Sequence, residues 1–211
     1  MYFPHNLDFR GRAYPIPPNL SHVGDDMCRG LLTFGEAKPL GERGLRWLKI
    51  HFANMSGHDK ASLDGRVEYA EEHLDDIFDS ADHPLDGRRV WLKADKPWQC
   101  LAVSFELAAA MRAPEPTEYM SRLAVHQDGT CNGLQHYAAL GGDLEAAASV
   151  NLDIGDKPAD VYTTVMNKVL IQMDKLIEQG DEMAIDLRPK ITRKVVKQTV
   201  SGARSFCETS C

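Results

Sequence analysis

The sequence lacks several features that would place it quickly in a class of protein. No apolar run is long enough to cross a bilayer, because the longest, residues 101–111, is interrupted by Ser104 and Glu106. The N-terminus has neither a basic flank nor an apolar signal core, so no targeting segment is visible. We therefore expect no membrane among the partners of this chain.

Cysteine is scarce and irregularly placed. The five cysteines are odd in number and widely spaced, and none forms a Cys-x-x-Cys pair. This pattern argues against a disulfide framework and a structural zinc site, and it is typical of reduced thiols in an intracellular compartment.

The chain also lacks the positive charge that is typical of a nucleic-acid-binding domain. It has 24 Lys and Arg against 31 Asp and Glu, which gives a formal net charge of −7. This charge argues against nucleic-acid binding over the whole surface. The charges are unevenly distributed, however, with acidic residues gathered in 68–86 and basic residues in 188–197. A local basic groove is compatible with that distribution.

What is present is an ordinary globular composition, with 43% hydrophobic and 26% charged residues in 211 positions. The hydrophobic spacing predicts an α+β fold that is mostly helical, with short strands around Asp128. The predicted helices cover 41–55, 63–81, 98–111, 132–140, 158–179 and 190–200, and the predicted strands cover 123–127 and 147–152. Residues 1–24, rich in proline and glycine, are expected to be extended with turns.

The strongest candidate site is the stretch His126-Gln-Asp128-Gly-Thr-Cys-Asn-Gly-Leu-Gln-His136-Tyr. A carboxylate at a strand end is held rigidly but still faces solvent, and Gly129 lets a ligand approach the backbone. That arrangement suits Mg²⁺, which binds one or two carboxylates together with water and substrate phosphates. An Asp-Gly turn between two elements explains the same residues. Histidines at the spacing of His126 and His136 are more often structural than metal ligands.

A second candidate is the basic stretch 188–197, which has five basic residues and no acid. On a helix, Arg193 and Lys197 share one face, and Lys190 and Lys194 share another. Like charges on one face repel each other unless an anion lies between them, and a triphosphate would serve. A solvated basic helix is the alternative interpretation.

Two weaker candidates lie nearer the N-terminus. Arg10 and Arg12 flank Gly11 among aromatic residues, a combination that suits a sugar-phosphate backbone and stacked bases. The alternative there is a surface loop with a local Asp–Arg pair, which is worth little energetically. Lys60 lies in a polar turn after a helix, where it could reach a phosphate or simply be solvated.

Taken in order, these motifs resemble the single-subunit DNA-directed RNA polymerases of phages and mitochondria, with the animal mitochondrial polymerase as the nearest likeness. The resemblance is carried by Phe3-Pro-His-Asn-Leu-Asp-Phe-Arg-Gly-Arg-Ala-Tyr-Pro, Trp47-Leu-Lys-Ile-His, the Asp128 stretch and Ile191-Thr-Arg-Lys-Val-Val-Lys-Gln-Thr-Val. It implies a partial palm domain over 1–145, the beginning of a fingers domain over 146–200 and a divergent tail over 201–211. It also implies location in the mitochondrial matrix.

The resemblance implies a role for each candidate residue. Asp128 would bind both catalytic Mg²⁺ ions, with the Gly129 carbonyl on one of them, and Lys197 would donate a proton to the leaving pyrophosphate. The nucleotide site would comprise Arg193, Lys197, Lys60 and Tyr162. The contacts to template DNA or the RNA hybrid would come from Arg10, Arg12 and Arg29. The implied reaction is two-metal phosphoryl transfer from ribonucleoside triphosphates to an RNA 3′ end.

The sequence departs from the family pattern in three places. Ala124 stands where the family usually has proline. After Val200 the chain continues Ser-Gly-Ala-Arg-Ser-Phe, whereas the family continues to a Tyr-Gly that selects ribose. The second catalytic aspartate, in a later His-Asp-Ser motif, does not occur. Because two metal ions need more than one carboxylate, we expect this chain alone not to polymerise nucleotides.

Three functions are compatible with these residues. The first is a fragment of a mitochondrial RNA polymerase, whose full-length parent would work with mitochondrial transcription factors. The second is a truncated, non-catalytic product that binds nucleic acid through Arg10, Arg12 and the basic helix. The third is an unrelated Mg²⁺-dependent hydrolase that combines Asp128 with an acidic cluster. The third is disfavoured because the acidic cluster lies on what is expected to be a solvated helix face.

Overall fold

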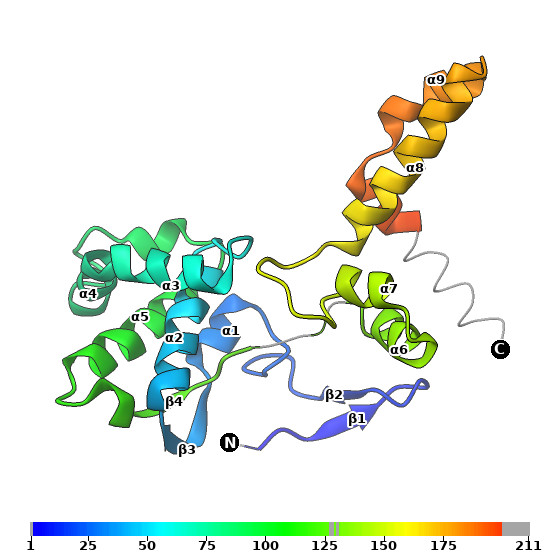
Figure 1. Ribbon diagram of the computed structural model, residues 1–211. Coiled ribbons are helices and arrows are strands. Elements are labelled where there is room, and N and C mark those ends of the chain that lie inside the picture. The colour runs from blue at the N-terminus through cyan, green and yellow to red at the C-terminus, as the bar shows by residue number, and fades with distance from the viewer. Residues whose placement is uncertain (1, 127–128, 130, 200–211) are drawn as a thin grey trace. The chain divides into compact units, whose positions relative to one another are not determined.

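The computed structural model describes residues 2–126, 129 and 131–199. These residues are mostly helical, and their strands form two antiparallel two-stranded sheets, so the predicted fold class is confirmed (Figure 1). The chain divides into two compact units, Met1–Asp128 and Gly129–Cys211. Asp128, Val200 and the predicted tail 201–211 lie outside the described residues. The palm and fingers boundaries stay predictions.

The first unit begins with an extended hairpin, as predicted for the N-terminal segment. Strand β1 (His5–Leu7) pairs antiparallel with β2 (Ala13–Pro15). Asp8 holds the turn between them, because its Oδ1 accepts hydrogen bonds from the backbone N–H groups of Arg10 and Arg12, each at 2.9 Å. Aspartate commonly stabilises turns through such side-chain-to-backbone bonds.

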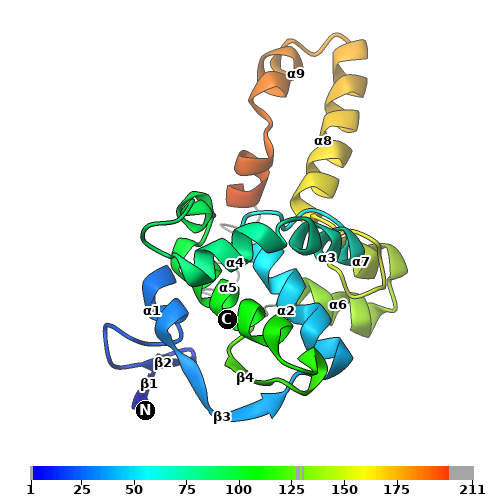
Figure 2. The ribbon, with the colours of Figure 1, turned by 90° about the vertical axis from the view of Figure 1, so that its left-hand side faces the viewer.

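Helices α2 (Gly41–Met55), α3 (Leu63–Glu72), α4 (Leu74–Asp82) and α5 (Pro97–Arg112) enclose the core of the first unit (Figures 1 and 2). Helix α5 is the buried helix that the sequence predicts, and Val103 and Leu107 on it are fully buried. Its N-terminus is tied to the short helix α1 (Asp26–Leu31). The Asp26 carboxylate accepts from the backbone N–H groups of Trp98 at 2.7 Å and Gln99 at 3.2 Å.

The single helix predicted over 63–81 is wrong, because α3 and α4 are separate helices that meet at His73. The backbone there leaves helical geometry, with φ −104° and ψ 19°. The His73 ring stacks on Tyr69 at 4.1 Å between centroids, and its Nδ1 lies 2.8 Å from the Tyr69 carbonyl oxygen. The break coincides with a side-chain contact rather than with proline or glycine, so apolar spacing could not locate it. The loop predicted next contains a turn of 3₁₀ helix, η1 (Val90–Lys93).

The strand that leads toward Asp128 lies earlier than predicted. Strand β4 (Met120–Leu123) pairs with β3 (Thr33–Pro39), with Leu123 opposite Thr33 and a bulge within β3, and residues 124–126 are not in a strand. A 3₁₀ turn, η2 (Pro116–Glu118), precedes β4. The predicted strand over 123–127 therefore fails, because pairing with β3 ends at Leu123.

Among its described residues, the second unit contains helices joined by turns and loops, and no strand. It comprises α6 (Asn132–Gly141), α7 (Leu144–Ser149), α8 (Val161–Glu178), α9 (Glu182–Leu187), the 3₁₀ turn η3 (Arg188–Lys190) and a helix over 193–199. Helix α6 ends as predicted, with Gly142 in the left-handed region at φ +63°. Helix α9 returns beside α8 (Figure 2), where the Arg188 side chain bonds the Asp174 carboxylate.

Two predictions for the second unit are corrected. The strand over 147–152 is instead helix α7 followed by a turn, because alanine-rich sequence favours a helix and Asp143 caps it by accepting from the Ala146 N–H at 3.0 Å. The last helix starts at residue 193 rather than 190. Lys190 belongs to η3, so Lys190 and Lys194 do not share a helix face. No helix among the described residues is long and apolar enough to span a membrane.

Candidate functional site

Tyr162, at the start of α8, lies at the centre of a group of charged side chains. We name Asp160, Tyr162, Arg193 and Lys197 the Tyr162 cluster. The guanidinium carbon of Arg193 lies 5.8 Å from the Tyr162 ring centroid, and the Lys197 ammonium nitrogen lies 6.0 Å from it. Both distances are at the outer limit for cation–π attraction. Of the residues predicted to bind nucleotide, the structure brings together Tyr162, Arg193 and Lys197.

The carboxylate of Asp160 supplies the counter-charge in this cluster. It caps α8, because Oδ1 accepts from the Tyr162 N–H at 3.2 Å, and Oδ2 accepts from the Thr163 hydroxyl at 2.8 Å and from Arg193 Nε. The hydrogen bond from Arg193 is the main cause that holds the pKa of Asp160 below its ordinary value. The same bond raises the pKa of Arg193. Both groups are therefore charged at neutral pH, and the cluster has two cations and one anion.

The segment before α8 is held by a side chain from outside it. Asn151 has a left-handed backbone, with φ +59°, and its side-chain amide makes two hydrogen bonds to Ala159. Nδ2 donates to the Ala159 carbonyl at 3.0 Å, and Oδ1 accepts from the Ala159 N–H at 2.6 Å. Gln135 on α6 donates to the neighbouring Val150 carbonyl at 2.8 Å. These bonds fix the backbone immediately before Asp160.

The residues that follow Asp128 approach the Tyr162 cluster. Cys131 has a left-handed backbone, with φ +54°, and its Sγ lies 3.7 Å from the Tyr162 hydroxyl. Gly129 lies close to the start of α6, where a β-carbon at position 129 would overlap Oδ1 of Asn132. A side chain at 129 would displace the Asn132 carboxamide, which explains why glycine suits this position.

Glu106 on α5 positions strand β4, which precedes Asp128 in the sequence. Its Oε1 accepts from the Ser121 hydroxyl at 2.6 Å and from the Arg122 N–H at 3.1 Å. Leu123, at the end of β4, packs against the core. The strand before Asp128 is thus fixed to the most buried helix of its unit.

Among the described residues, the histidines on either side of Asp128 belong to no group arranged to hold a metal ion. Burial, together with the positive charge of Arg29, lowers the pKa of His126 below its ordinary value. The same positive charge opposes binding of a further cation at His126. His136 is exposed, and the described parts of the chain contain no group of three or more His, Cys, Asp or Glu arranged to hold a metal ion.

The arginines predicted to bind nucleic acid make local contacts in the first unit. Arg10 pairs with Asp8 at 3.2 Å and lies over the Phe9 ring at 5.4 Å, so the local Asp–Arg pair is present. Arg29 donates through Nε to the Gly24 carbonyl at 2.9 Å. Arg12 contributes its backbone N–H to the hairpin turn. None of these contacts tests nucleic-acid binding, which stays a prediction for all three.

Sequence reasoning missed Arg66, which stabilises the loop that carries Lys60. Arg66 is 7% exposed, and it donates to the Ala61 carbonyl at 3.0 Å and to the Asn54 side chain at 2.9 Å. Lys60 is exposed and pairs with the adjacent Asp59 at 3.1 Å. Nothing in the spacing distinguishes Arg66 from a surface arginine, because its partners are a backbone carbonyl and a residue on another helix.

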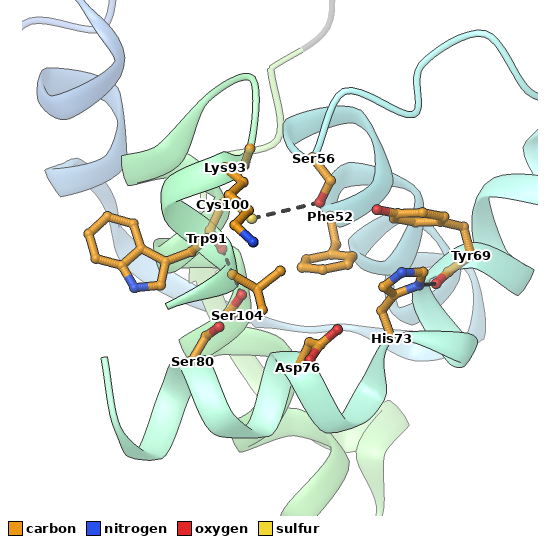
Figure 3. Close-up of a pocket in the computed structure, with 12 residues that line it drawn as sticks. Phe52, Ser56, Tyr69, His73, Asp76, Ser80, Trp91, Lys93, Cys100 and Ser104 are labelled. Carbon is orange, nitrogen blue, oxygen red and sulfur yellow. Dashed lines mark hydrogen bonds between the residues drawn. The ribbon is translucent and has the colours of Figure 1, made fainter. Parts of the chain in front are cut away.

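A small cavity lined by apolar and polar side chains lies between α2, α3, α4 and α5 (Figure 3). Its walls include Ser56, Tyr69, His73, Asp76 and Cys100, and none of the predicted site residues. Burial raises the pKa of Cys100 to about 11. The cavity measures about 100 Å³, whereas sites for drug-sized ligands measure about 300–1,000 Å³. It is therefore too small for a nucleotide, and the Tyr162 cluster is the better candidate.

The Tyr162 cluster presents two cations near one ring and a helix-capping carboxylate that pairs with only one of them. The model of the DNA-dependent RNA polymerase family matches residues 38–203. This chain belongs to the DNA-dependent RNA polymerase family.

Named relatives agree with this assignment. The mitochondrial DNA-directed RNA polymerase of Neurospora crassa is 59% identical over 94% of this chain and 14% of its own length. DNA-directed RNA polymerase 2, chloroplastic/mitochondrial, of Arabidopsis thaliana is 55% identical over 94% of this chain and 20% of its own length. The mitochondrial DNA-directed RNA polymerase of Schizosaccharomyces pombe is 54% identical over 94% of this chain and 17% of its own length. This chain therefore spans about one-fifth or less of the length of these relatives.

Proposed function

We propose that this chain is part of a mitochondrial DNA-directed RNA polymerase and contributes the site for the triphosphate of an incoming ribonucleotide. The carrying observation is the Tyr162 cluster, in which Arg193 and Lys197 meet over one ring although like charges repel. Asp160 neutralises one of the two charges. A triphosphate would neutralise the rest through charge-assisted hydrogen bonds, with Lys197 placed to donate a proton to the leaving pyrophosphate.

The proposal assigns the remaining residues by family membership. Asp128 and the Gly129 carbonyl offer oxygen donors, which Mg²⁺ prefers, and the bound ion would neutralise charge on the phosphates. Lys60 would contact a phosphate of the nucleotide. Contacts to template DNA and RNA would come from Arg10, Arg12 and Arg29. The likeness to mitochondrial polymerases supports a place in the mitochondrion. We propose that the full-length parent works there with mitochondrial transcription factors.

The alternative of a Mg²⁺-dependent hydrolase loses support from the contacts of the acidic helix. Asp76 pairs with Arg88 at 2.9 Å, and Asp79 accepts the Arg88 N–H at 2.7 Å. These carboxylates hold the loop after α4.

We further propose that the 211-residue polypeptide does not polymerise nucleotides by itself, because Asp128 supplies one carboxylate and two-metal chemistry needs more.

A binding titration with Mg²⁺ and ATP tests the proposed triphosphate site. Arg193→Ala and Lys197→Ala are each expected to weaken binding about tenfold, because each removes a charge-assisted contact. Lys194→Ala is the matched control, since it removes the same charge from the same helix but is not one of the two cations placed over the Tyr162 ring. Equal losses in all three variants would indicate nonspecific attraction and would contradict the proposal. Far-ultraviolet circular dichroism checks that each variant keeps its helices.

A further inference from the structure

We propose that Asp160 is a positioning residue that holds Arg193 by its Nε, so that the two terminal nitrogens of the guanidinium are presented to a polyphosphate. The inference rests on the proposed function and goes beyond it, because Asp160 contacts no substrate in this scheme. It acts only through Arg193, which lies 33 positions further along the chain.

Among the described residues, Asp160 accepts a hydrogen bond from only one of the three guanidinium nitrogens of Arg193. Asp160 Oδ2 accepts from Arg193 Nε, and within the described residues no hydrogen bond to Arg193 Nη1 or Nη2 is present. The Arg193 side chain is 53% exposed to solvent. Because the guanidinium is planar and rigid, fixing Nε also fixes the direction in which the terminal pair points.

The second observation is a contrast with another pair in the same unit. Asp174 engages Arg188 through both carboxylate oxygens, which accept from Nε and from Nη2, the latter at 3.1 Å. In the first unit, Asp82 accepts from both terminal nitrogens of Arg112, at 2.8 and 2.6 Å. Those two arginines are held in forked pairs, which is the strong arrangement for a structural contact. Arg193 is held by one nitrogen and keeps the rest of its fork for another anion.

The third observation is that Asp160 is itself held in place. Its two oxygens accept from the Tyr162 N–H and the Thr163 hydroxyl, and the residue before it is clamped by Asn151. Its side chain is 33% exposed. A carboxylate that caps a helix and is fixed on both oxygens cannot follow Arg193 if that side chain moves. It therefore serves as a fixed anchor rather than as a mobile competitor for the triphosphate.

A double-mutant cycle tests this role, with inorganic tripolyphosphate and Mg²⁺ as the probe and the 211-residue chain as the protein. Asp160→Asn is expected to weaken binding about threefold to tenfold, because it removes the ion pair but keeps an oxygen to cap α8. In an Arg193→Ala background, Asp160→Asn is expected to have no further effect.

Two control variants separate positioning from loss of structure. Asp181→Asn alters the cap of α9, where the carboxylate accepts from the Met183 and Ala184 N–H groups. Asp174→Asn alters the forked pair with Arg188. Neither is expected to change tripolyphosphate affinity. The Nε–H resonance of Arg193 in ¹⁵N nuclear magnetic resonance gives a direct signature, which is expected to shift in Asp160→Asn and to stay unchanged in both controls.

The outcomes are distinct. Tighter binding by Asp160→Asn would show that the carboxylate competes with phosphate, and an equal loss in the Arg193→Ala background would show a general structural role. Either result overturns the inference. If Arg193→Ala itself binds tripolyphosphate as tightly as the unaltered chain, the proposed function fails and the inference falls with it. If Arg193→Ala weakens binding while Asp160→Asn does not, only the inference fails.

Discussion

The two units of the chain are built on different principles. The first has a continuous core in which Leu48, Ile77, Val103 and Leu107 are each at most 2% exposed. In the second unit, the longest helix, α8, buries none of its residues, and the buried positions on other elements are mainly alanine and valine. Apolar burial is the main source of folding free energy, so the first unit has the larger intrinsic stability.

This difference in buried core between the two units corresponds to where the proposed ligand-binding side chains lie. The Tyr162 cluster lies wholly in the second unit. Its three charged side chains are partly or largely exposed to solvent. The strand that enters the Asp128 region is fixed to the core of the first unit through Glu106. Rigid support and the proposed substrate contacts are therefore separated along the chain, as is common where binding residues need to move.

The largest expected effect is a core truncation in the first unit. Leu107→Ala is expected to lower the free energy of unfolding by about 2–5 kcal/mol, because Leu107 is fully buried. Leu140→Ala in the second unit, at a side chain that is 87% exposed, is expected to change it by at most about 0.5 kcal/mol. Urea titration followed by circular dichroism measures both. Similar effects for the two variants would contradict the comparison.

A pH titration of stability sharpens the same comparison. Burial lowers the pKa of His51 from 6.5 to about 4, and its Nδ1 has no hydrogen-bond partner among the residues that the structure describes. Between these two values the unfolded chain binds a proton that the folded chain does not. The stability contributed by neutral His51 is therefore present near pH 7 and is lost as the pH falls from 6.5 toward 4.

We expect His51 to account for about 2 kcal/mol of the stability lost on acidification from pH 7 to pH 4.5. The fluorescence of Trp47, Trp91 and Trp98, the three tryptophans of the chain, reports on the first unit. In His51→Gln the urea midpoint is expected to depend less steeply on pH. An unchanged pH dependence would show that other groups carry the effect.

A smaller effect is expected from the bond network between α1 and α5. Asp26→Ala removes the carboxylate that accepts from the Trp98 and Gln99 N–H groups. The expected loss is about 1–2 kcal/mol, the usual cost of removing a helix cap. Asp25→Ala, which removes the cap of α1 through the Cys28 N–H, is the control and is expected to cost less because α1 is a short helix. Equal losses would show that the tether between α1 and α5 contributes nothing beyond an ordinary cap.

Local features of the sequence predict local features of the structure. The bounds of α2 and α6 follow from apolar spacing and from Gly142 after α6, whereas α5 extends one residue beyond the predicted range at each end. Arg193 and Lys197 share a face because they are four apart on a helix. These inferences need only the period of the helix and the usual residues at its ends.

Contacts between distant residues could not be predicted in this way. The break at His73 coincides with ring stacking, the extent of β4 depends on pairing with β3, and the burial of Arg66 depends on Asn54. The partner of Arg193 is Asp160, on a different helix. Each of these is set by tertiary structure, which apolar period and local propensity do not encode.

Hydrogen exchange in the presence and absence of Mg²⁺ and tripolyphosphate tests the central claim, that the Tyr162 cluster binds polyphosphate. Amide hydrogen exchange at residues 160–163 and 193–199 is expected to slow when the ligand is bound, and the exchange rates of the buried residues of α5 are expected to stay unchanged. Binding that leaves both of these segments unchanged, and instead slows exchange around the cavity at Tyr69 and Cys100, would contradict it.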